Sequence, residues 1–414
     1  MLIISHPTAN QNVRAAVKGL VDAGVEIQFN TSVAAFPGSF IHQLSRLPGF
    51  SEIRRRTFDP SFRYSTQTNP FKEVARMVAS KAGLRSLTKH ETGMFSIDAV
   101  YQSLDHKVSK VVRKRKNEIA AVYAYEDGAI QTFLTAKENN IACLYDLPIG
   151  YWRVARELLA LEMKKYPDWT PTLTGLSDSN RKLHQKDEEL RLADHIFVAS
   201  TFTAKTLASF PGNLPQINII PYGFPTPGPI KVYDYKGQRP LKVLFVGGLT
   251  QRKGLSYLFE AAKYLKPHIE LTIVGKKMSG DCAPLNEGLE SNTWIPSLPN
   301  SEILELMHAH DVLIFPSLFE GFGLVITEAM AQGTPVITTD RTAGPDLITN
   351  EENGWLVEAG TTESLIIALQ NILSSPSLVM KAGIEAIEAA RRRPWEFYGN
   401  ELAAAVLKIC EKKN

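Results

Sequence analysis

Short apolar segments alternate with longer amphipathic segments in two separate series along the chain. The first series begins at Leu2–Ser5 and the second at Leu241–Val246, and the apolar segments of both have the length of buried strands. Strands that alternate with helices predict parallel sheets covered by helices on both faces. Between the two series lies the segment 222–240, which is rich in proline and glycine and has the composition of a linker. The sequence therefore predicts two α/β domains.

Length and composition limit the class of protein. The 414 residues are enough for two or three domains, each with its own hydrophobic core. No apolar run approaches the roughly 20 residues that a membrane-spanning helix needs, and the first residues lack the pattern of a signal peptide. The three cysteines, Cys143, Cys282 and Cys410, are too far apart in sequence to indicate a metal-ligand pair or a disulfide framework. We therefore expect a cytoplasmic protein.

Positive charge is concentrated in the first part of the chain. Residues 1–116 contain 18 Lys and Arg but only 8 Asp and Glu, with basic runs at Arg54–Arg56 and Arg113–Lys116. A solvated basic surface is the ordinary explanation. The alternatives are an anionic acceptor or peripheral contact with an anionic membrane, where each basic residue adds about 1 kcal/mol of attraction. No nucleic-acid-binding motif accompanies the charge, so we expect no nucleic-acid partner.

The stretch from Phe315 to Gly333 is the strongest candidate site. A strand ends there, a glycine-containing turn follows, and a helix is predicted from about Leu324. Ligands of parallel sheets bind beyond the carboxyl ends of the strands, and the free N–H groups of a helix N-terminus favour a phosphate. Glu320 is placed to reach a sugar and Glu328, one turn into the helix, to accept from ribose hydroxyls. The alternative is a surface glutamate and a capping acid.

A second candidate site follows the first strand of the second series. Arg252 and Lys253 come between that strand and a helix predicted from Leu255, at the edge of the same cleft. Two cations there can neutralise the charge that grows on a departing diphosphate. The alternative is a basic helix N-terminus on the surface. It is disfavoured because positive charge at the positive end of a helix dipole destabilises unless an anion is bound.

Together with Leu271–Gly275, these two stretches resemble the retaining glycosyltransferases of family 4, which have the GT-B fold. Further matches are Ala193–Ser200, Ile219–Phe224, Asn353–Val357 and Pro394–Phe397. The resemblance covers roughly residues 190–400. It implies an acceptor-binding Rossmann-like domain over residues 1–222 and a nucleotide-sugar-binding one over residues 240–395. A C-terminal helix, residues 396–414, is expected to return to the first domain.

The resemblance also implies roles for individual residues. Glu320 would contact the donor sugar, Glu328 the ribose, and Arg252 and Lys253 the leaving diphosphate. Further donor-binding positions, several of them through the backbone, would be Gly321, Phe322, Gly323, Leu324, Val325, Gly248, Gly275 and Pro296. The family uses Arg and Lys for neutralisation and the chain contains no Asp-x-Asp, so we expect neither a metal nor a cofactor besides the nucleotide-diphosphate sugar.

The chain departs from the family pattern in three places. Where the family often has Gly-Arg, this chain has Gly247-Gly248, so Arg252 is expected to supply the missing cation. The loop after the first strand has no glycine; its His6 and Asn10 are candidate acceptor contacts. The usual histidine near residue 125 is missing. Its role in proton transfer falls to Glu126 or Asp127, or to neither, and Asp146 at the next strand end is a further acceptor-side candidate.

The expected function is retaining transfer of a sugar from a nucleotide-diphosphate sugar to a hydroxyl of an acceptor. The acceptor class stays open between a carbohydrate, a lipid-linked molecule and a small molecule. Two alternatives also stay open: a phosphorylase or sucrose-synthase-like enzyme on the same fold, and a non-catalytic sugar-nucleotide-binding protein. A nicotinamide dehydrogenase is disfavoured because no Gly-x-Gly-x-x-Gly follows the first strand of either series.

Overall fold

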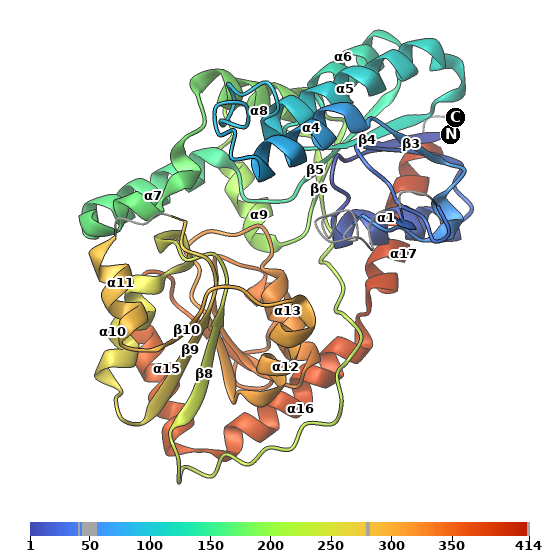
Figure 1. Cartoon of the computed structure of the whole chain (residues 1–414). Helices are drawn as coiled ribbons and strands as arrows, with labels where there is room; N and C mark the ends of the chain where they lie inside the picture. The colour runs from blue at the N-terminus through green and yellow to red at the C-terminus, as the bar shows by residue number, and fades with distance from the viewer. Residues whose placement is uncertain (40–41, 44–55, 279–281, 412–414) are drawn as a thin grey trace.

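The computed structural model describes the whole chain except residues 40–41, 44–55, 279–281 and 412–414 (Figure 1). Two parallel sheets lie one above the other, each covered by helices, so the two α/β domains predicted from the sequence are confirmed. The first sheet has the strand order β3-β2-β1-β4-β5-β6-β7 and the second the order β10-β9-β8-β11-β12-β13.

The N-terminal sheet uses strands from the first half of the chain. Its strands are β1 (Leu2–Ser5), β2 (Ile27–Thr31), β3 (Thr66–Thr68), β4 (Ala121–Tyr125), β5 (Ala142–Leu147), β6 (His195–Val198) and β7 (Gln216–Ile219). Its helices are α1 (Gln11–Asp22), α4 (Pro70–Lys81), α5 (Ile97–Lys114), α6 (Ile130–Glu138), α7 (Trp152–Lys165), α8 (Asn180–Leu192) and α9 (Thr201–Thr206). The central strands β1, β4 and β5 are buried at every position, as parallel strands covered on both faces must be.

The C-terminal sheet repeats this pattern. Its strands are β8 (Leu241–Val246), β9 (Ile269–Val274), β10 (Thr293–Ile295), β11 (Val312–Phe315), β12 (Val336–Thr339) and β13 (Gly354–Val357). Its helices are α10 (Leu255–Tyr264), α11 (Ala283–Glu290), α12 (Asn300–Ala309), α13 (Leu324–Ala331), α14 (Gly344–Leu347), α15 (Thr362–Ser374) and α16 (Ser377–Arg392). No single helix of the described residues is long and apolar enough to cross a membrane; α15 and α16 meet that test only as a pair bent by 107°.

The chain crosses between the domains at two adjacent places. After β7 it descends through Phe224, whose N–H donates to the carbonyl of Arg393 over 2.9 Å, and Phe224 also bridges to Pro394. Helix α17 (Trp395–Glu411) then rises beside α1 (Figure 1). The two helices touch at glycines, since a Cβ on Gly19 would lie 2.2 Å from the carbonyl carbon of Gly399.

The linker 222–240 is fixed to the C-terminal domain along its length. The N–H of Gly228 donates to Ala331 over 2.8 Å, and the hydroxyl of Tyr233 donates to Gly333 over 2.8 Å. Arg239 forms an ion pair of 2.6 Å with Asp311. The composition of this segment predicts a linker, and it does connect the two domains. These bonds also hold it against the C-terminal domain.

Helix α7 and the short 3-10 helix η3 (Pro167–Thr172) belong to the first series but lie on the C-terminal domain (Figure 1). The buried carboxylate of Glu162 accepts hydrogen bonds from the hydroxyl of Tyr257 (2.8 Å) and from Nε2 of Gln251 (3.0 Å). The N–H of Gln251 donates to the hydroxyl of Thr172 over 2.9 Å. Gln251 directly precedes Arg252, so the N-terminal domain helps to position this candidate loop.

Candidate active site

The turn between β11 and α13 has the geometry that its glycines predict. Gly323 caps α13 in the left-handed region with φ of 90°, where a side chain is strained, and a Cβ there would lie 2.8 Å from the ring of Phe315. The helix begins at Leu324, and its first N–H groups and positive dipole end point to the same edge of the sheet as the strand ends.

The carboxylate of Glu320 binds both predicted cations. Oε1 of Glu320 lies 2.7 Å from Nη1 of Arg252, forms a second ion pair with Nζ of Lys253, and accepts from the hydroxyl of Ser317 over 3.0 Å. Burial raises the pKa of Glu320, but the charges of Lys253 and Arg252 outweigh it and hold the pKa below its ordinary value. Glu320 is therefore ionised near neutral pH.

Arg252 and Lys253 lie in the 3-10 helix η6 (Gln251–Lys253), which follows β8. The carbonyl of Arg252 accepts from the N–H of Leu318 over 2.8 Å, which joins the two candidate loops through their backbones. The side chain of Lys253 is only 12% exposed, so the surface-cation alternative does not describe it. Burial lowers the pKa of Lys253, and the nearby charge of Glu320 opposes that shift.

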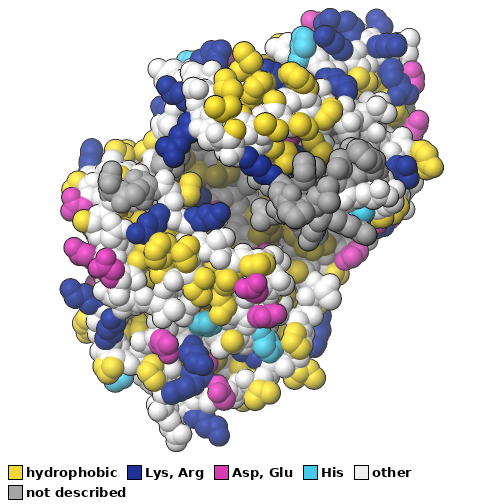
Figure 2. All heavy atoms as spheres, in the orientation of Figure 1, with side chains coloured by type: hydrophobic (Ala, Val, Ile, Leu, Met, Phe, Trp, Pro, Cys, Tyr) yellow, Lys and Arg dark blue, Asp and Glu magenta, His cyan; other side chains and the backbone are white. Residues whose placement is uncertain are grey.

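Glu328 faces a cavity of about 630 Å³ between the domains. The cavity is lined by Gln11 of α1, by the crossing segments 224–227 and 394–396, and by Asn300, Leu324, Thr327 and Glu328. Figure 2 shows a hollow between the two domains on one face of the molecule. Oε1 of Glu328 accepts from Nδ2 of Asn300 over 3.3 Å, and burial raises the pKa of Glu328.

The N-terminal domain covers the turn that carries Glu320. The carbonyl of Gly321 accepts from the hydroxyls of Ser200 (2.5 Å) and Thr203 (3.0 Å) at the start of α9. A Cβ on Gly321 would lie 1.8 Å from the carbonyl oxygen of Pro148, so only glycine fits at this contact. Glu320 and Glu328 thus lie on one strand–helix junction, Glu320 under the domain contact and Glu328 at the cavity.

The other predicted donor-side positions lie in this turn and helix or after other strands of the same sheet. Gly248 and Gly275 follow β8 and β9, and a Cβ on Gly275 would lie 1.9 Å from the carbonyl oxygen of Gly247. Pro296 is exposed after β10, the next strand of the sheet. The ring of Phe322 is buried against Tyr222, with 4.8 Å between centroids, and Val325 is half-buried in the first turn of α13.

A family comparison covers both candidate loops. The family model described as Glycosyl transferases group 1 matches residues 235–392, which include Arg252, Lys253, Glu320 and Glu328. The match covers the C-terminal domain and less than half of the chain. The N-terminal domain lies outside the match.

Curated relatives are similar over part of their length. The chain is 28% identical over 190 residues to the alpha-maltose-1-phosphate synthase of Mycolicibacterium smegmatis, which covers 42% of this chain and 48% of that protein. It is 35% identical over 172 residues to the D-inositol 3-phosphate glycosyltransferase of Rhodococcus jostii, which covers 38% of each. The chain therefore spans less than half the length of these relatives.

Solved structures match the whole chain. The sucrose-phosphate synthase of Thermosynechococcus elongatus is similar with a TM-score of 0.64 and 17% identity, over 99% of both chains. HepE of Anabaena in complex with UDP-glucose is similar with a TM-score of 0.62 and 14% identity, over 98% of this chain and 99% of that one. These likenesses and the two parallel sheets confirm the GT-B fold.

Glu126 and Asp127, at the end of β4, are paired within the N-terminal domain. Glu126 is buried 3.2 Å from Nζ of Lys186, and Asp127 lies 3.4 Å from Nζ of Lys182; both lysines belong to α8. Burial raises the pKa of Glu126 to about 6, although the charge of Lys186 opposes the shift. Among the described residues, α8 rather than the C-terminal domain supplies their ion-pair partners.

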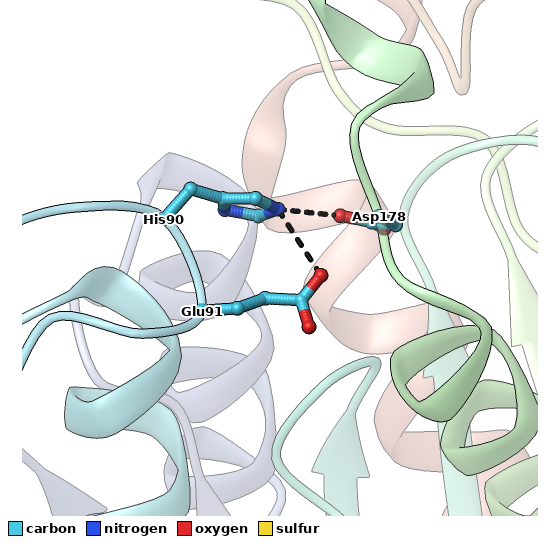
Figure 3. Close-up of side chains that lie close together, drawn as sticks. All are labelled: His90, Glu91 and Asp178. Carbon is cyan, nitrogen blue, oxygen red and sulfur yellow. Dashed lines mark hydrogen bonds and ion pairs between the residues drawn. The ribbon is translucent and has the colours of Figure 1, made fainter.

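A cluster that the sequence did not single out lies beside these lysines. His90, Glu91 and Asp178 point toward one another from a loop and from the segment just before α8 (Figure 3), with 2.9 Å between Nε2 of His90 and Oδ1 of Asp178. Their ligand atoms lie within 4.8 Å of one another, a spacing that a metal ion can bridge. Asp178 also lies 3.4 Å from Lys182 and 3.5 Å from Lys186. We interpret the cluster as an ion-pair network that joins the loop to α8.

His6 and Asn10 shape the first loop. Nδ1 of His6 accepts from the N–H groups of Ala9 (2.8 Å) and Thr8 (3.1 Å), and Ala9 has a φ of 47°. Burial, helped by the charge of Arg56, lowers the pKa of His6 to about 3, so the imidazole is neutral. Asn10 is exposed and accepts from the hydroxyl of Thr8 over 3.2 Å. His6 therefore supports the turn that glycines make in the family.

Asp146 lies deep beneath the cleft, at the end of β5. It is 4% exposed and accepts from the hydroxyl of Tyr123 over 2.7 Å. Burial raises the pKa of Asp146 to about 7, with little opposition from that hydrogen bond. Its surroundings include Tyr125, Tyr222 and Tyr398, which join the N-terminal sheet to α17.

The structure describes only Arg56 of the basic run Arg54–Arg56, for which a solvated surface or an anionic contact was expected. Arg54 and Arg55 lie outside the described residues. Arg56 is 7% exposed and forms a buried ion pair with Glu73 of α4, so it is not a surface cation. Nη1 of Arg56 also donates to the carbonyl of Pro7 over 3.3 Å. A sequence run shows charge but not the long-range partner that buries it.

Proposed function

We propose that this protein transfers a sugar from a nucleotide-diphosphate sugar to an acceptor hydroxyl, with retention of the anomeric configuration, as family 4 glycosyltransferases do. The observation that carries the proposal is the convergence of Glu320, Arg252 and Lys253 beside the N-terminus of α13. A sugar-binding carboxylate, two phosphate-binding cations and free helix N–H groups lie at one strand–helix junction.

The donor's nucleoside is assigned to the cavity between the domains. Its volume of about 630 Å³ lies in the usual range for small-molecule sites. Glu328 offers carboxylate oxygens to ribose hydroxyls, and Asn300 orients it. HepE of Anabaena, which shares the fold, is seen with UDP-glucose, which supports a nucleotide-diphosphate sugar as the donor class.

The diphosphate is assigned to Arg252 and Lys253. The bonds from Arg252 to Glu320 and to the carbonyl of Phe319 both use Nη1. A guanidinium has five N–H groups, so within the described structure donors remain for phosphate oxygens. Because these cations are partly withdrawn from water, with side chains 28% and 12% exposed, each stabilises the charge that develops on the leaving group more strongly than a fully solvated cation would. We therefore assign the neutralisation of the leaving diphosphate to the side chains of Arg252 and Lys253.

The acceptor is assigned to the side of the cleft formed by the N-terminal domain. A retaining transfer has the acceptor hydroxyl attack the face from which the diphosphate leaves, and the leaving phosphate then takes its proton. The contact of Gly321 with Pro148 and α9 excludes water from the Glu320 turn, which limits hydrolysis of the donor. Glu126, Asp127, Asp146, His6 and Asn10 stay candidates for acceptor-side roles.

The test is release of nucleoside diphosphate from a panel of UDP-, GDP- and ADP-sugars. We expect slow hydrolysis of one donor by the wild type and a loss of at least about a hundredfold in Glu320→Gln. Glu358→Gln, at a glutamate outside the cleft loops, is the matched control. Nuclear magnetic resonance of a transfer product reads its anomeric configuration. Tight nucleotide binding without turnover on any donor and acceptor would replace the proposal with a sugar-nucleotide-binding protein.

A further inference from the structure

Helix α4 carries apolar side chains on the face that points away from its domain. Phe71, Val74 and Val78 are spaced so that they share one face, and they are 72%, 47% and 62% exposed. On the opposite face Glu73 and Met77 are buried. Glu73 pairs with Arg56 and Arg76, so the acidic side chain of this helix is neutralised inside the domain. The helix is therefore apolar on its outer face.

The loop after α4 extends this apolar face into a groove of about 580 Å³. The groove is lined by apolar side chains, which include Phe71, Val74, Val78, Leu84, Leu87 and Phe95. Met94 and Ile97, each 62% exposed, continue the same segment. An exposed apolar area of this kind is unusual for a protein surface without a partner. No hydrogen-bonding side chain lines the groove, which suits hydrocarbon better than a polypeptide.

Basic residues stand next to the lining residues of the groove in the sequence. Arg85 and Lys89 are exposed, and Lys72 lies against the groove with Nζ 5.3 Å from the ring centre of Phe95. The acidic residues of segment 70–97 are Glu73, which is buried, and Glu91, which accepts two hydrogen bonds from Ser179. Apolar side chains bordered by Lys and Arg are the pattern of a helix that lies in the headgroup region of an anionic bilayer.

We propose that this α4 surface, formed by Phe71, Val74, Val78, Leu84 and Phe95 with Lys72, Arg85 and Lys89 at its edge, docks on an anionic lipid bilayer. Figure 2 shows hydrophobic side chains gathered on the N-terminal domain beside the hollow between the domains, with Lys and Arg around them. Docking there turns the cleft toward the lipid headgroups. Given the proposed function, this favours an acceptor with a lipid anchor; the docking itself does not depend on transfer.

Vesicle flotation of the full chain tests the proposal. The vesicles are equimolar phosphatidylglycerol and phosphatidylcholine, compared with phosphatidylcholine alone. We expect the wild type to bind the anionic vesicles and Phe71→Ser/Val78→Ser to bind at least about tenfold more weakly. The matched control is Ile230→Ser/Val232→Ser, which changes two side chains that are 88% and 83% exposed on the linker. All four changed side chains are exposed, so folding should be unaffected, and circular dichroism checks this.

A charge series separates the electrostatic part. Arg85→Gln/Lys89→Gln should weaken anionic binding about thirtyfold, at about 1 kcal/mol per charge, and the loss should shrink as salt is added. Lys381→Gln/Arg392→Gln, two exposed cations on α16, should leave binding unchanged. Wild-type protein that ignores anionic vesicles, or control pairs that lose binding equally, would overturn the proposal. Dimers without vesicle binding, broken by Phe71→Ser/Val78→Ser, would assign the surface to a second copy instead.

Donor hydrolysis in vesicle-free solution keeps the two proposals apart. The α4 variants should hydrolyse the donor like the wild type, because α4 contributes none of the residues that line the donor cavity in the described structure. Vesicle binding with no activity on any donor would support docking and contradict the transferase. Donor hydrolysis with no vesicle binding would support the transferase and contradict docking.

Discussion

The two domains hold their charged candidate residues in different ways. In the C-terminal domain, Glu320 meets Arg252 and Lys253 from two strand–helix junctions on the same edge of one sheet. In the N-terminal domain, Glu126 meets Lys186 of a helix about sixty residues later in the chain. The first arrangement follows from local geometry that repeats in every parallel sheet. The second depends on which helix packs nearby. A charged residue at a strand end is therefore a better indication of a site in the C-terminal domain than in the N-terminal domain.

The largest expected effect breaks the C-terminal cluster. Lys253→Met removes one phosphate-binding cation while it keeps most of the apolar volume. We expect kcat for donor hydrolysis to fall about thousandfold, as when a preorganised electrostatic group is lost. Lys276→Met, at an exposed lysine that follows β9, is the control. Equal kinetics for the two variants would mean that the cluster is a structural ion pair, like those of the N-terminal domain.

The domain contact over Glu320 is tested by Gly321→Ala. The added Cβ would lie 1.8 Å from the carbonyl oxygen of Pro148, so the domains must shift apart. We expect a cost of about 3 kcal/mol, read as a lower unfolding midpoint in urea, together with faster donor hydrolysis relative to transfer because water enters. Gly175→Ala, where nothing lies within 4 Å of an added Cβ, should change neither. A stable Gly321→Ala protein would show that the contact is loose in solution.

Asp146 tests the N-terminal side through pH. Its folded-state pKa is raised to about 7 by burial, so the fold favours the protonated form. The stability of the wild type should therefore fall as the pH rises from 3.8, the ordinary pKa of an aspartate, to about 7. Above that pH the stability should stay low. Asp146→Asn should be more stable than the wild type by about 4 kcal/mol near pH 7 and lose that advantage below pH of about 4, in urea unfolding.

The activity of Asp146→Asn also distinguishes a structural role of this carboxyl from a catalytic one. If sugar transfer persists in Asp146→Asn, the residue is structural. If Asp146 takes part in proton transfer, sugar transfer should be lost in this variant. Asp340→Asn, at an exposed carboxylate after β12, should leave the pH dependence of stability unchanged. Stability of the wild type that rises over the same pH window would contradict the buried, protonated state.

The smallest expected effect concerns the first loop. His6→Leu leaves the N–H groups of Ala9 and Thr8 without their acceptor and should cost about 1 kcal/mol or somewhat more. His6→Asn, whose oxygen can take the place of Nδ1, should recover most of it. Thermal unfolding measures both. A raised acceptor KM in a fully stable His6→Asn would instead show that the imidazole touches the acceptor.

The sequence predicted the frame of the site well. Strands β8 and β11 begin and end close to where their apolar runs do, because a fully buried strand must stay apolar until it reaches the ligand edge. Gly323 marked the start of α13 because only glycine takes its backbone conformation without strain. The meeting of Glu320 with Arg252 follows once both loops are placed at the same edge.

The rest depends on partners that are distant in sequence. Nothing near Arg56 indicates that Glu73 will bury it, and nothing near Glu162 indicates that α7 will cross to the other domain and bind Gln251. The role of His6 as a backbone acceptor follows from the turn at Ala9, which has no glycine to mark it. The spacing of Phe71, Val74 and Val78 places them on one face of α4, but nothing near them in the sequence indicates that this face points outward.

The paired crossings at Phe224 and Arg393–Pro394 have a mechanical consequence. Two neighbouring backbone segments, bonded to each other, thus join the domains at this edge, in addition to the contacts of α7, η3 and α9. A protease that cuts the linker 222–240 breaks one of these two connections. The other, which leads through Arg393 and Pro394 to α17, stays intact and keeps α17 packed on α1. The two halves of a nicked molecule should therefore stay together in native buffer and part only when the fold is lost.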